Sequence, residues 1–512
     1  MISHAGGSSP SPWCITVDRR LLSEACRALV SYSGLIETDS GKRAAKMQSN
    51  QARQDRTMPR PSSVIAGMLG TALGHHQAGR LTEAERIYRQ ILAIDARQPD
   101  SLHLLGMIAY ADGRHEAAVE LIHRAIAINR KQAAYHSNLG TVLQAQGWLD
   151  EAATCYKRAL ALQPDLPEVH TNLGNILQAQ DKLDEAVASQ ERALALNPLL
   201  AEPHYNLGQA QLLQEDFESG WQNLEWRWQS KDHETPMRYP QPLWTGEKLA
   251  SGRLLIWGEQ GVGDEIMFAG LMPDAIRTGN RCLLDCDPRL QPLFARSFPG
   301  IEVLSGHVSE HDVARLSIAA HLPSGSLPSL FRTSKAAFAA TTSPYLIADP
   351  AERDRFRARY ADGRRLVGLA WFTKNQKTGR NRSIDLSLLA PLFARSDIRW
   401  VSLQYGDHDA LRNQAAAASA PILIDRGVDQ FADIDVFAAQ IAALDMVITI
   451  DNSTAHLAGA LGVPAWVLLP FARDWRWLRA RPDSPWYPTL RLFRQLQLGD
   501  WQSVVQEVCS AL

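Results

Sequence analysis

Hydrophobic and polar positions alternate in two different ways along this chain of 512 residues. From about residue 65 to 232, apolar positions recur at the spacing of amphipathic helices, and short polar turns separate them. Beyond residue 250 the apolar residues gather into short runs, such as 253–257, 446–450 and 465–469. Runs of this kind, with helical stretches between them, predict buried strands of parallel sheets. The pattern therefore predicts a helical region followed by an α/β region.

The helical region repeats itself every 34 residues, which is the period of a stacked helix pair. One column of the repeat falls at a turn: Gly79, Gly113, Gly147, Asp181 and Glu215. Two further columns hold small residues, as expected where paired helices cross: Ala84, Ala118, Ala152, Ala186 and Gly220, and the Leu-Gly pairs at 105–106, 139–140, 173–174 and 207–208. The pattern resembles the tetratricopeptide repeat. It predicts an α solenoid of four full units, with a Trp-rich degenerate fifth unit that caps the solenoid or docks it on another domain.

Asparagine forms one more column of the repeat. Asn138, Asn172 and Asn206 occupy the same place in three successive units. Equal spacing predicts that the three amides lie on one wall of the solenoid, where they can hydrogen-bond the backbone of an extended peptide. The alternative is that asparagine merely suits this helical position. The first reading predicts a protein or peptide partner.

These changes of pattern predict five segments. They are a disordered N-terminal segment at 1–62, the repeats at 63–232, a polar linker with three prolines at 233–250, and two Rossmann-like halves at 251–350 and 351–512. The other predicted strands are 281–286, 301–304, 366–371, 400–403 and 422–424. Two doubly wound sheets joined in this way predict a ligand cleft between them.

Composition argues against binding to nucleic acid or to a membrane. The chain is 45% hydrophobic and 21% charged, with a net charge of −2, so no overall positive field favours nucleic acid or an anionic membrane. No long apolar run predicts a transmembrane helix, and the N-terminus shows no secretory signal. The six scattered cysteines are expected to be free thiols, so the cytoplasm is the predicted compartment.

The most informative motif is the strand–helix–strand unit at 446–470. An apolar run ends at Asp451, three helix-capping residues follow (Asn452, Ser453 and Thr454), and His456 is expected to open the helix. Helix N-termini at the carboxyl edge of a parallel sheet bind phosphates. This predicts a donor site around Asp451 and His456. The alternative is an ordinary crossover in which the aspartate only caps a helix.

A glycine-rich loop opens the first half of the α/β region. The strand ending at 257 is followed by Gly261, Gly263 and Asp264, with a helix expected from about residue 265. The spacing is G-x-x-G-x-G, which differs from the dinucleotide fingerprint and argues against a nicotinamide cofactor. Asp264 or Glu259 can serve as a general base at this sheet edge. Alternatively, Asp264 is only a helix N-cap.

Basic residues follow the first strand of the second half. Lys374, Lys377, Arg380 and Arg382 suit the binding of a diphosphate, although a solvated charge run is the alternative. Ser383 is expected to cap the next helix.

Two further loops carry weaker signals. Gln404 and Tyr405 follow a strand and can contact a nucleoside. The segments 474–478 and 484–495 mix aromatic residues with arginine, and we interpret them as packing in preference to sugar stacking.

Five segments together resemble glycosyltransferase family 9, the heptosyltransferase-like group, and in particular its bacterial members with N-terminal tetratricopeptide repeats. These segments are GEQGVGDEIMF, RNRSIDL, VSLQYGD, ITIDNSTAHLAGALGVPAWVLL and DWRWL with SPWYP. The resemblance implies a GT-B fold and an inverting, metal-independent transfer without a cofactor. The acceptor would lie on the first half and a nucleotide-diphosphate sugar on the second. It also implies Asp264 as catalytic base and a D-[TS]-x-x-x-H pattern on Asp451 and His456, with Asn452 where Thr or Ser is usual.

The sequence thus predicts a hexosyl or heptosyl transferase with Asp264 and His456 as catalytic residues. Its donor would be bound by residues 451–454, Lys374, Lys377, Arg382, Gln404 and Tyr405, and its acceptor would be a protein held by the repeats. Two alternatives stay open: transfer to a glycan or a lipid-linked saccharide, and a non-catalytic repeat adaptor with a decayed transferase domain. Self-association through the solenoid also remains open.

Overall fold

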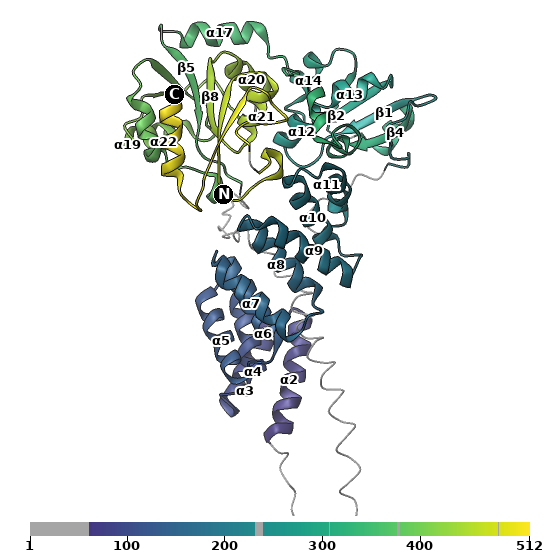
Figure 1. Cartoon of the computed structure of the whole chain (residues 1–512), viewed down its shortest axis with the longest axis vertical. Helices are drawn as coiled ribbons and strands as arrows, with labels where there is room; N and C mark the ends of the chain where they lie inside the picture. The colour runs from purple at the N-terminus through teal and green to yellow at the C-terminus, as the bar shows by residue number, and fades with distance from the viewer. Residues whose placement is uncertain (1–60, 231–238, 307, 342, 376–378, 480) are drawn as a thin grey trace, which may run out of the picture. The chain divides into compact units, whose positions relative to one another are not determined.

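The computed structural model describes residues 61–230, 239–306, 308–341, 343–375, 379–479 and 481–512. Residues 1–60 of the segment predicted to be disordered (1–62) lie outside the described residues, and so do 231–238, which include the start of the predicted linker (233–250). Residues 61 and 62 of the same segment belong to a helix, so the prediction is wrong there. The chain forms two compact units (Figure 1). The first runs to Gln180 and includes Arg192–Pro198, and the second comprises Asp181–Glu191 and Leu199–Leu512.

The first unit is the helical solenoid that the 34-residue period predicts. Its helices are α2 (Pro61–Gln77), α3 (Leu81–Ile94), α4 (Pro99–Ala111), α5 (His115–Ile128), α6 (Ala133–Ala145), α7 (Leu149–Leu162) and α8 (Pro167–Ala179). Consecutive helices pair, and the small-residue column lets them approach. A Cβ on Gly140 of α6 would lie 2.8 Å from the ring of Tyr156 on α7, so any larger residue at this crossing requires the ring to shift.

The last helices of the repeat belong to the second unit. α9 (Leu183–Leu196) runs across the division between the units, and α10 (Ala201–Leu213), α11 (Phe217–Leu224) and the 3₁₀ turn η1 (Glu225–Gln229) follow. We call residues 201–229 the docked helices. Trp221 of α11 is buried, donates from Nε1 to the carbonyl of Arg332 at 2.8 Å, and meets Trp475 edge-on at 5.4 Å between ring centres. The Trp-rich unit is thus packed into the α/β body.

A four-stranded parallel sheet forms the first half of the α/β body, in the order β3-β2-β1-β4. Its strands are β1 (Arg253–Trp257), β2 (Cys282–Cys286), β3 (Glu302–Ser305) and β4 (Ile318–Pro323). Its helices are α12 (Val262–Ala269), α13 (Met272–Arg277), α14 (Gln291–Ser297), α15 (Glu310–Arg315) and α16 (Leu327–Phe331), with 3₁₀ turns η2 (Ser324–Ser326) and η3 (Lys335–Ala340). The sequence analysis missed β4, whose run is interrupted by His321 and ends in proline.

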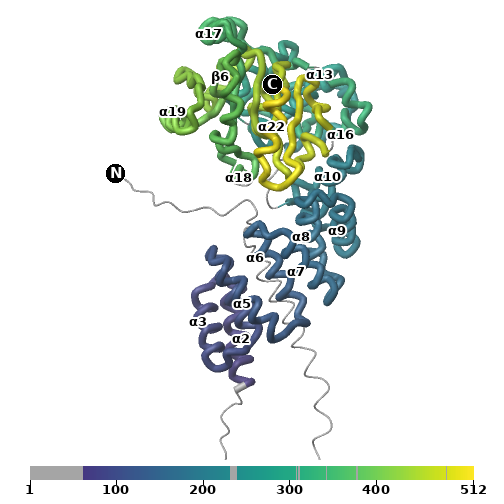
Figure 2. The backbone as a smooth tube through the Cα atoms, turned by 60° about the vertical axis from the view of Figure 1, so that its left-hand side comes forward, coloured from purple at the N-terminus to yellow at the C-terminus, as the bar shows by residue number. Residues whose placement is uncertain are grey.

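A six-stranded parallel sheet forms the second half, in the order β10-β9-β8-β5-β6-β7. Its strands are β5 (Arg365–Ala370), β6 (Ile398–Ser402), β7 (Ile422–Leu423), β8 (Met446–Ile450), β9 (Ala465–Leu469) and β10 (Leu490–Arg494). Its helices are α17 (Pro350–Tyr360), α18 (Gly379–Arg382), α19 (His408–Ala417), α20 (Ile434–Ala442), α21 (Ser453–Ala460) and α22 (Trp501–Ala511), with 3₁₀ segments η4 (Leu386–Ala394) and η5 (Trp475–Trp477). α22 packs against η4 and β10 and can be followed in Figure 2.

Three predicted helix starts are wrong by a few residues. α12 begins at Val262, so Asp264 lies inside its first turn and is not the N-cap. α21 begins at Ser453, so His456 does not open it. Asp385 caps η4, whereas the hydroxyl of Ser383 accepts from the Thr373 N–H. Among the residues described, no helix is both long and apolar enough to cross a bilayer.

Candidate functional site

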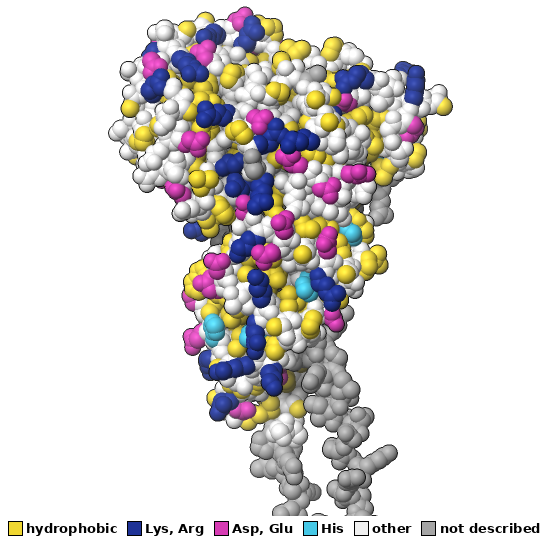
Figure 3. Space-filling model, viewed as in Figure 1, with side chains coloured by type: hydrophobic (Ala, Val, Ile, Leu, Met, Phe, Trp, Pro, Cys, Tyr) yellow, Lys and Arg dark blue, Asp and Glu magenta, His cyan; other side chains and the backbone are white. Residues whose placement is uncertain are grey.

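A cavity of about 950 Å³ lies between the two sheets of the second unit. Its wall is built at the carboxyl ends of β1, β5, β6, β8 and β9, where parallel sheets bind ligands. Charged side chains gather over this part of the surface (Figure 3). Of the predicted site residues, the wall includes Gly263, Asp264, Lys374, Arg382, Tyr405, Asp451, Asn452, Ser453 and His456. The two acidic corners that the sequence singles out therefore face one space.

The glycine loop brings Asp264 to the cavity by a different geometry from the one expected. The left-handed residue of this loop is Gln260, with φ of +67°, whereas Gly261 is extended and caps α12. Gly263 favours close approach, because a Cβ there would make a tight contact of 3.2 Å with Cδ2 of His456. The start of α12 therefore packs directly on α21, and the two halves meet at the cavity.

Arg476 lies at the centre of the charged network. Its Nε donates to Oδ1 of Asp264 at 2.7 Å, and its Nη1 donates to Oδ1 of Asp474 at 3.1 Å. Burial opposes the charge of Arg476, but Asp264 and Asp474 outweigh burial and raise its pKa further. Burial likewise opposes the charge of Asp474, and Arg476 and Arg382 lower the pKa of that carboxyl. Both residues are therefore charged at neutral pH.

Asp451 is buried at the end of β8 and is held from two sides. Its Oδ1 accepts a hydrogen bond from Trp477 Nε1 at 2.8 Å, and its Oδ2 lies 3.1 Å from Nε of Arg382. Arg382 also donates to Asp474 at 3.1 Å. Arg382 thus joins the two loops after β8 and β9, with its side chain partly exposed in the cavity wall.

His456 is a neutral imidazole in the folded protein. Burial lowers its pKa to about 4, although Asp264 and Asp451 act in the opposite direction. Nδ1 lies 3.0 Å from the Tyr487 hydroxyl, and the ring stacks on Trp477 at 5.0 Å. At neutral pH this side chain can orient a ligand by hydrogen bonding, but it supplies no positive charge.

The capping residues of α21 have distinct surroundings. Asn452 Oδ1 accepts from the Thr454 N–H and from the Thr449 hydroxyl, both at 3.0 Å. Within the described residues, its buried Nδ2 has no hydrogen-bond partner. Ser453 lines the cavity, whereas Thr454 is buried outside the wall. The amide orientation therefore presents a donor at the helix start.

The predicted donor loops after β5 and β6 reach the cavity only in part. Lys374 is exposed in its wall, 5.9 Å from the ring centre of Tyr405, whereas Lys377 lies outside the described residues. Gln404 does not line the cavity. It is fully buried, and its Oε1 accepts from the N–H groups of Trp371 and Phe372. Its role is to join the ends of β5 and β6.

Glu259, the alternative general base, is occupied by a structural contact. The buried guanidinium of Arg227 donates to both of its oxygens, at 2.9 and 2.7 Å, and the Gly325 N–H donates at 2.9 Å. Glu259 is not part of the cavity wall. Among the predicted acids of this loop, only Asp264 faces the cavity.

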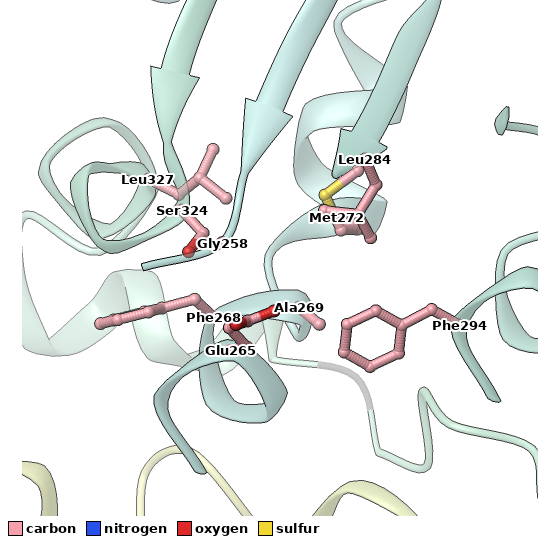
Figure 4. A pocket seen from close by; sticks show the side chains of 9 residues that line it. All are labelled: Gly258, Glu265, Phe268, Ala269, Met272, Leu284, Phe294, Ser324 and Leu327. Carbon is pink, nitrogen blue, oxygen red and sulfur yellow. The ribbon is translucent and has the colours of Figure 1, made fainter. Parts of the chain in front are cut away.

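Glu265, the neighbour of Asp264, faces a second and much smaller cavity behind α12 (Figure 4). This space measures about 10 Å³, which is about the room that one water needs. Apolar side chains surround the carboxyl, and burial raises its pKa to about 7, although the Asp287 N–H donates to it at 2.9 Å. A Cβ on Gly258 would lie 2.5 Å from this carboxylate, so glycine is required there.

Several wall residues escaped the sequence analysis, notably Asp474, Arg476, Arg289 and Phe431. In the segment 474–478, interpreted above as packing, Trp475 and Trp477 are buried, whereas Asp474 and Arg476 line the cavity. The alternation of charged and aromatic residues was the available signal. Arg289 of the first half stacks over Phe431 of the second at 4.7 Å.

The asparagine column does not present a uniform row of free amides. Asn138 Nδ2 lies 2.8 Å from Nε2 of the buried His103, and Asn172 is itself buried. Asn206 lies on α10 and belongs to the second unit.

Comparison with known families identifies the repeats. Residues 144–181 and 174–214 match the family described as TPR repeat, and residues 75–139 match the family described as tetratricopeptide repeat. The predicted repeats are therefore confirmed.

A curated relative extends further along the chain. Protein FlbA of Caulobacter vibrioides is 32% identical over 316 residues, which cover 57% of this chain and 52% of FlbA. The chain thus spans about half the length of this relative.

Solved structures resemble part of the chain. They include MamA (18% identity, 30% of this chain and 91% of that chain, TM-score 0.29) and YrrB, titled a TPR protein with an unusual peptide-binding site (20%, 34% and 94%, TM-score 0.30). PilF of Pseudomonas aeruginosa is 17% identical and covers 43% of this chain and 87% of its own, with a TM-score of 0.33.

Proposed function

We propose that the chain is an inverting glycosyltransferase of GT-B type, which moves a sugar from a nucleotide-diphosphate donor to an acceptor hydroxyl. The observation that carries this proposal is the single cavity of about 950 Å³ in which Asp264 of one sheet faces Asp451, His456 and Arg382 of the other. Its size suits a nucleotide sugar.

Asp264 is the general base. Arg476 holds its Oδ1, which leaves Oδ2 to take the proton of the acceptor hydroxyl. The deprotonated oxygen forms a bond to the anomeric carbon from the face opposite the donor phosphate. The bond from that carbon to the phosphate oxygen breaks, and the diphosphate leaves with the electron pair. The sugar is thereby inverted.

The departing diphosphate is stabilised by the start of α21 and by the cations of the second half. The start of α21 lies in the cavity wall at Asn452 and Ser453, where the N-terminus of a helix favours an anion. Lys374 and Arg382 supply positive charge. Asp451 and the neutral His456 orient the donor by hydrogen bonds.

The acceptor is a protein bound by the repeats. Tetratricopeptide solenoids offer an extended concave surface to other chains, and this chain devotes its whole first unit to such repeats.

Replacement of the base tests the proposal. Asp264→Asn is expected to lower nucleotide release 10²- to 10⁴-fold, because the amide cannot accept the proton. Release is measured with ADP-, GDP- and UDP-sugars, and calorimetry with the free diphosphates should show affinity within a few-fold of the parent. Glu265→Gln is the matched control, since this neighbour lies outside the wall and should retain turnover. Lost nucleotide binding with intact turnover contradicts the role of Asp264.

A non-catalytic adaptor is the second candidate. Its supporting observation is that Asp264, Asp451 and Asp474 are each paired with an arginine of the chain itself. An adaptor would release no nucleotide from any of the three donors and would bind none of the free diphosphates.

A further inference from the structure

We infer that the docked helices are a positioning part of this site. Together with Asp181, they hold in place the two loops whose contact brings Asp264 and Arg476 together. The inference rests on the proposed function for its kinetic consequences, whereas its structural consequences can be measured without any substrate.

The glycine loop is held by Arg227 of η1. Its guanidinium is fully buried, grips both oxygens of Glu259, and donates to the Ser326 hydroxyl at 2.9 Å. Two charge-assisted bonds to one carboxylate fix its orientation as well as its position. Glu259 precedes the left-handed Gln260, and Asp264 follows within one helical turn. Arg227 therefore sets the start of α12 without touching the cavity.

The loop after β9 is held on its far side by Trp221 and Asp181. Trp221 packs edge-on against Trp475, one residue before Arg476. Asp181 accepts from Nε of Arg479 at 3.1 Å, and Arg479 also donates to the Asp181 carbonyl at 3.1 Å. Arg473 lies 3.7 Å from the same carboxylate. Contacts from the repeats thus flank Arg476 on both sides along the chain.

Tyr205 of α10 lies beside the charged network itself. Burial raises the pKa of its hydroxyl, and Arg476, Asp474 and Asp264 are the principal charges that act on it. α10 also packs against η5, the turn that carries Arg476. The helix therefore packs beside the network and supports the turn that carries Arg476.

The docked helices and the two loops therefore have different roles. Their helices keep the two catalytic loops in register, and the loops provide the base and its arginine. Loosening the docked helices should lower turnover and leave the donor corner around Lys374 and Asn452 unchanged.

Arg227→Gln in the full chain is the principal test. Hydrogen exchange by mass spectrometry should show amides of residues 259–264 and 473–479 exchanging at least ten-fold faster, with β5 and β8 unchanged. The kcat for nucleotide release should fall 10- to 100-fold, while calorimetric affinities for ADP, GDP and UDP stay within three-fold. Arg227→Lys keeps the charge but loses the two-pronged contact, so it should restore only part of the rate.

Asp181→Asn and Glu215→Gln form a matched pair. Both residues occupy the turn column of the repeat with positive φ, +60° and +65°, but the ion-pair partner of Glu215 is Lys335 of η3, outside residues 259–264 and 473–479. Asn tolerates the left-handed backbone, so the first variant removes only the charge. We expect Asp181→Asn to lower kcat two- to five-fold and to speed exchange in 473–479, and Glu215→Gln to change neither.

The two proposals can fail separately. If the parent releases no nucleotide, the proposed transfer fails, and faster exchange of both loops still upholds the positioning role. If exchange in both loops is unchanged in Arg227→Gln and Asp181→Asn, the positioning role is overturned. Should Arg227→Gln not fold, Arg227→Met with Glu259→Gln removes both charges together and allows the same measurements.

Discussion

The first and the last repeats of the solenoid share one period but use its positions differently. At the turn, Gly79, Gly113 and Gly147 adopt φ of +74° to +82°, where glycine has no steric penalty. Asp181 and Glu215 adopt the same left-handed backbone with a side chain, which costs about 1–2 kcal/mol each. Both use that side chain in an ion pair within the α/β unit. The difference indicates that the turn position of a repeat can keep its backbone conformation and also carry a side chain that makes an ion pair.

The helix crossings of the first and the last repeats also differ, in what the crossing glycine contacts. In the free repeats, the glycine of α6 meets a side chain, the ring of Tyr156, whereas Gly208 of α10 meets backbone: its Cβ would lie 2.7 Å from the Leu224 nitrogen. Side chains can move by a few tenths of an ångström more easily than two packed helices can. The crossing at Gly208 is thus backbone against backbone, whereas the crossing at Gly140 meets a side chain.

Trp221→Ala should have the largest effect among the variants that test the difference between the docked helices and the free repeats. Removing a buried tryptophan typically costs about 3–5 kcal/mol, and this ring packs against Trp475 and Trp486. The free energy of unfolding of the α/β unit should fall by about that amount, as measured by urea denaturation with tryptophan fluorescence. Trp148→Ala, a half-exposed tryptophan in a free repeat, should change stability by no more than about 0.5 kcal/mol. Equal effects would show that docking adds nothing.

Lowering the pH should destabilise the first unit more than the second, and this difference in stability should be smaller than the effect of Trp221→Ala. Burial lowers the pKa of His76 to about 4 and that of His103 to about 3, from 6.5 in the unfolded chain. As pH falls, these histidines take up protons in the unfolded solenoid before they do so in the folded one. The free energy of unfolding of the solenoid therefore decreases below pH 6.5, by about 2 kcal/mol per histidine at pH 5.

The α/β unit contains opposing groups. The lowered pKa of His456 also destabilises the folded α/β unit as pH falls. Glu265 acts in the opposite direction: because its pKa is raised from 4.5 to about 7, it stabilises the folded unit as pH falls from 7 toward 4.5. Region-resolved hydrogen exchange at pH 7 and pH 5, corrected for intrinsic rates, should show the larger loss in residues 61–180. His103→Gln should reduce that loss. A uniform loss across both units would contradict the assignment.

Alanine at the two crossing glycines gives the smallest contrast. Gly208→Ala should destabilise the α/β unit by about 1–2 kcal/mol, because overpacking against backbone outweighs the gain in helix propensity. Gly140→Ala should be nearly neutral, because the Tyr156 ring can shift. Chemical denaturation of the two variants measures the difference, and a larger effect at Gly140 would reverse the comparison.

Local patterns accounted for most of the fold. The repeat was visible because small residues and turn glycines recur in several columns, and β1, β8 and β9 match their predicted bounds because each is an uninterrupted run that ends at a turn. β4 and β10 were missed because arginine, histidine or proline interrupts them, and pairing with a neighbouring strand keeps them extended. Propensity does not record such pairing.

The site was predictable only where one loop carries the signal. Asp451 directly follows a strand, and Asp264 lies in the first turn of the helix that follows one, so their place at the sheet edge follows from local order. Arg476 lies 212 residues beyond its partner Asp264, between two buried tryptophans, and the alternation of charged and aromatic residues around it does not identify that partner. Gln404 has the position of a ligand-binding residue, but its burial between β5 and β6 depends on tertiary packing.

The distance along the chain between the aspartate and its arginine also bears on biosynthesis. Helix pairs of the solenoid involve only near neighbours and can form as the chain leaves the ribosome. The pair can form only after Arg476, which lies in the last tenth of the 512 residues, has emerged. A product truncated just before residue 474 would therefore keep its repeats but lack Asp474 and Arg476 of the charged network.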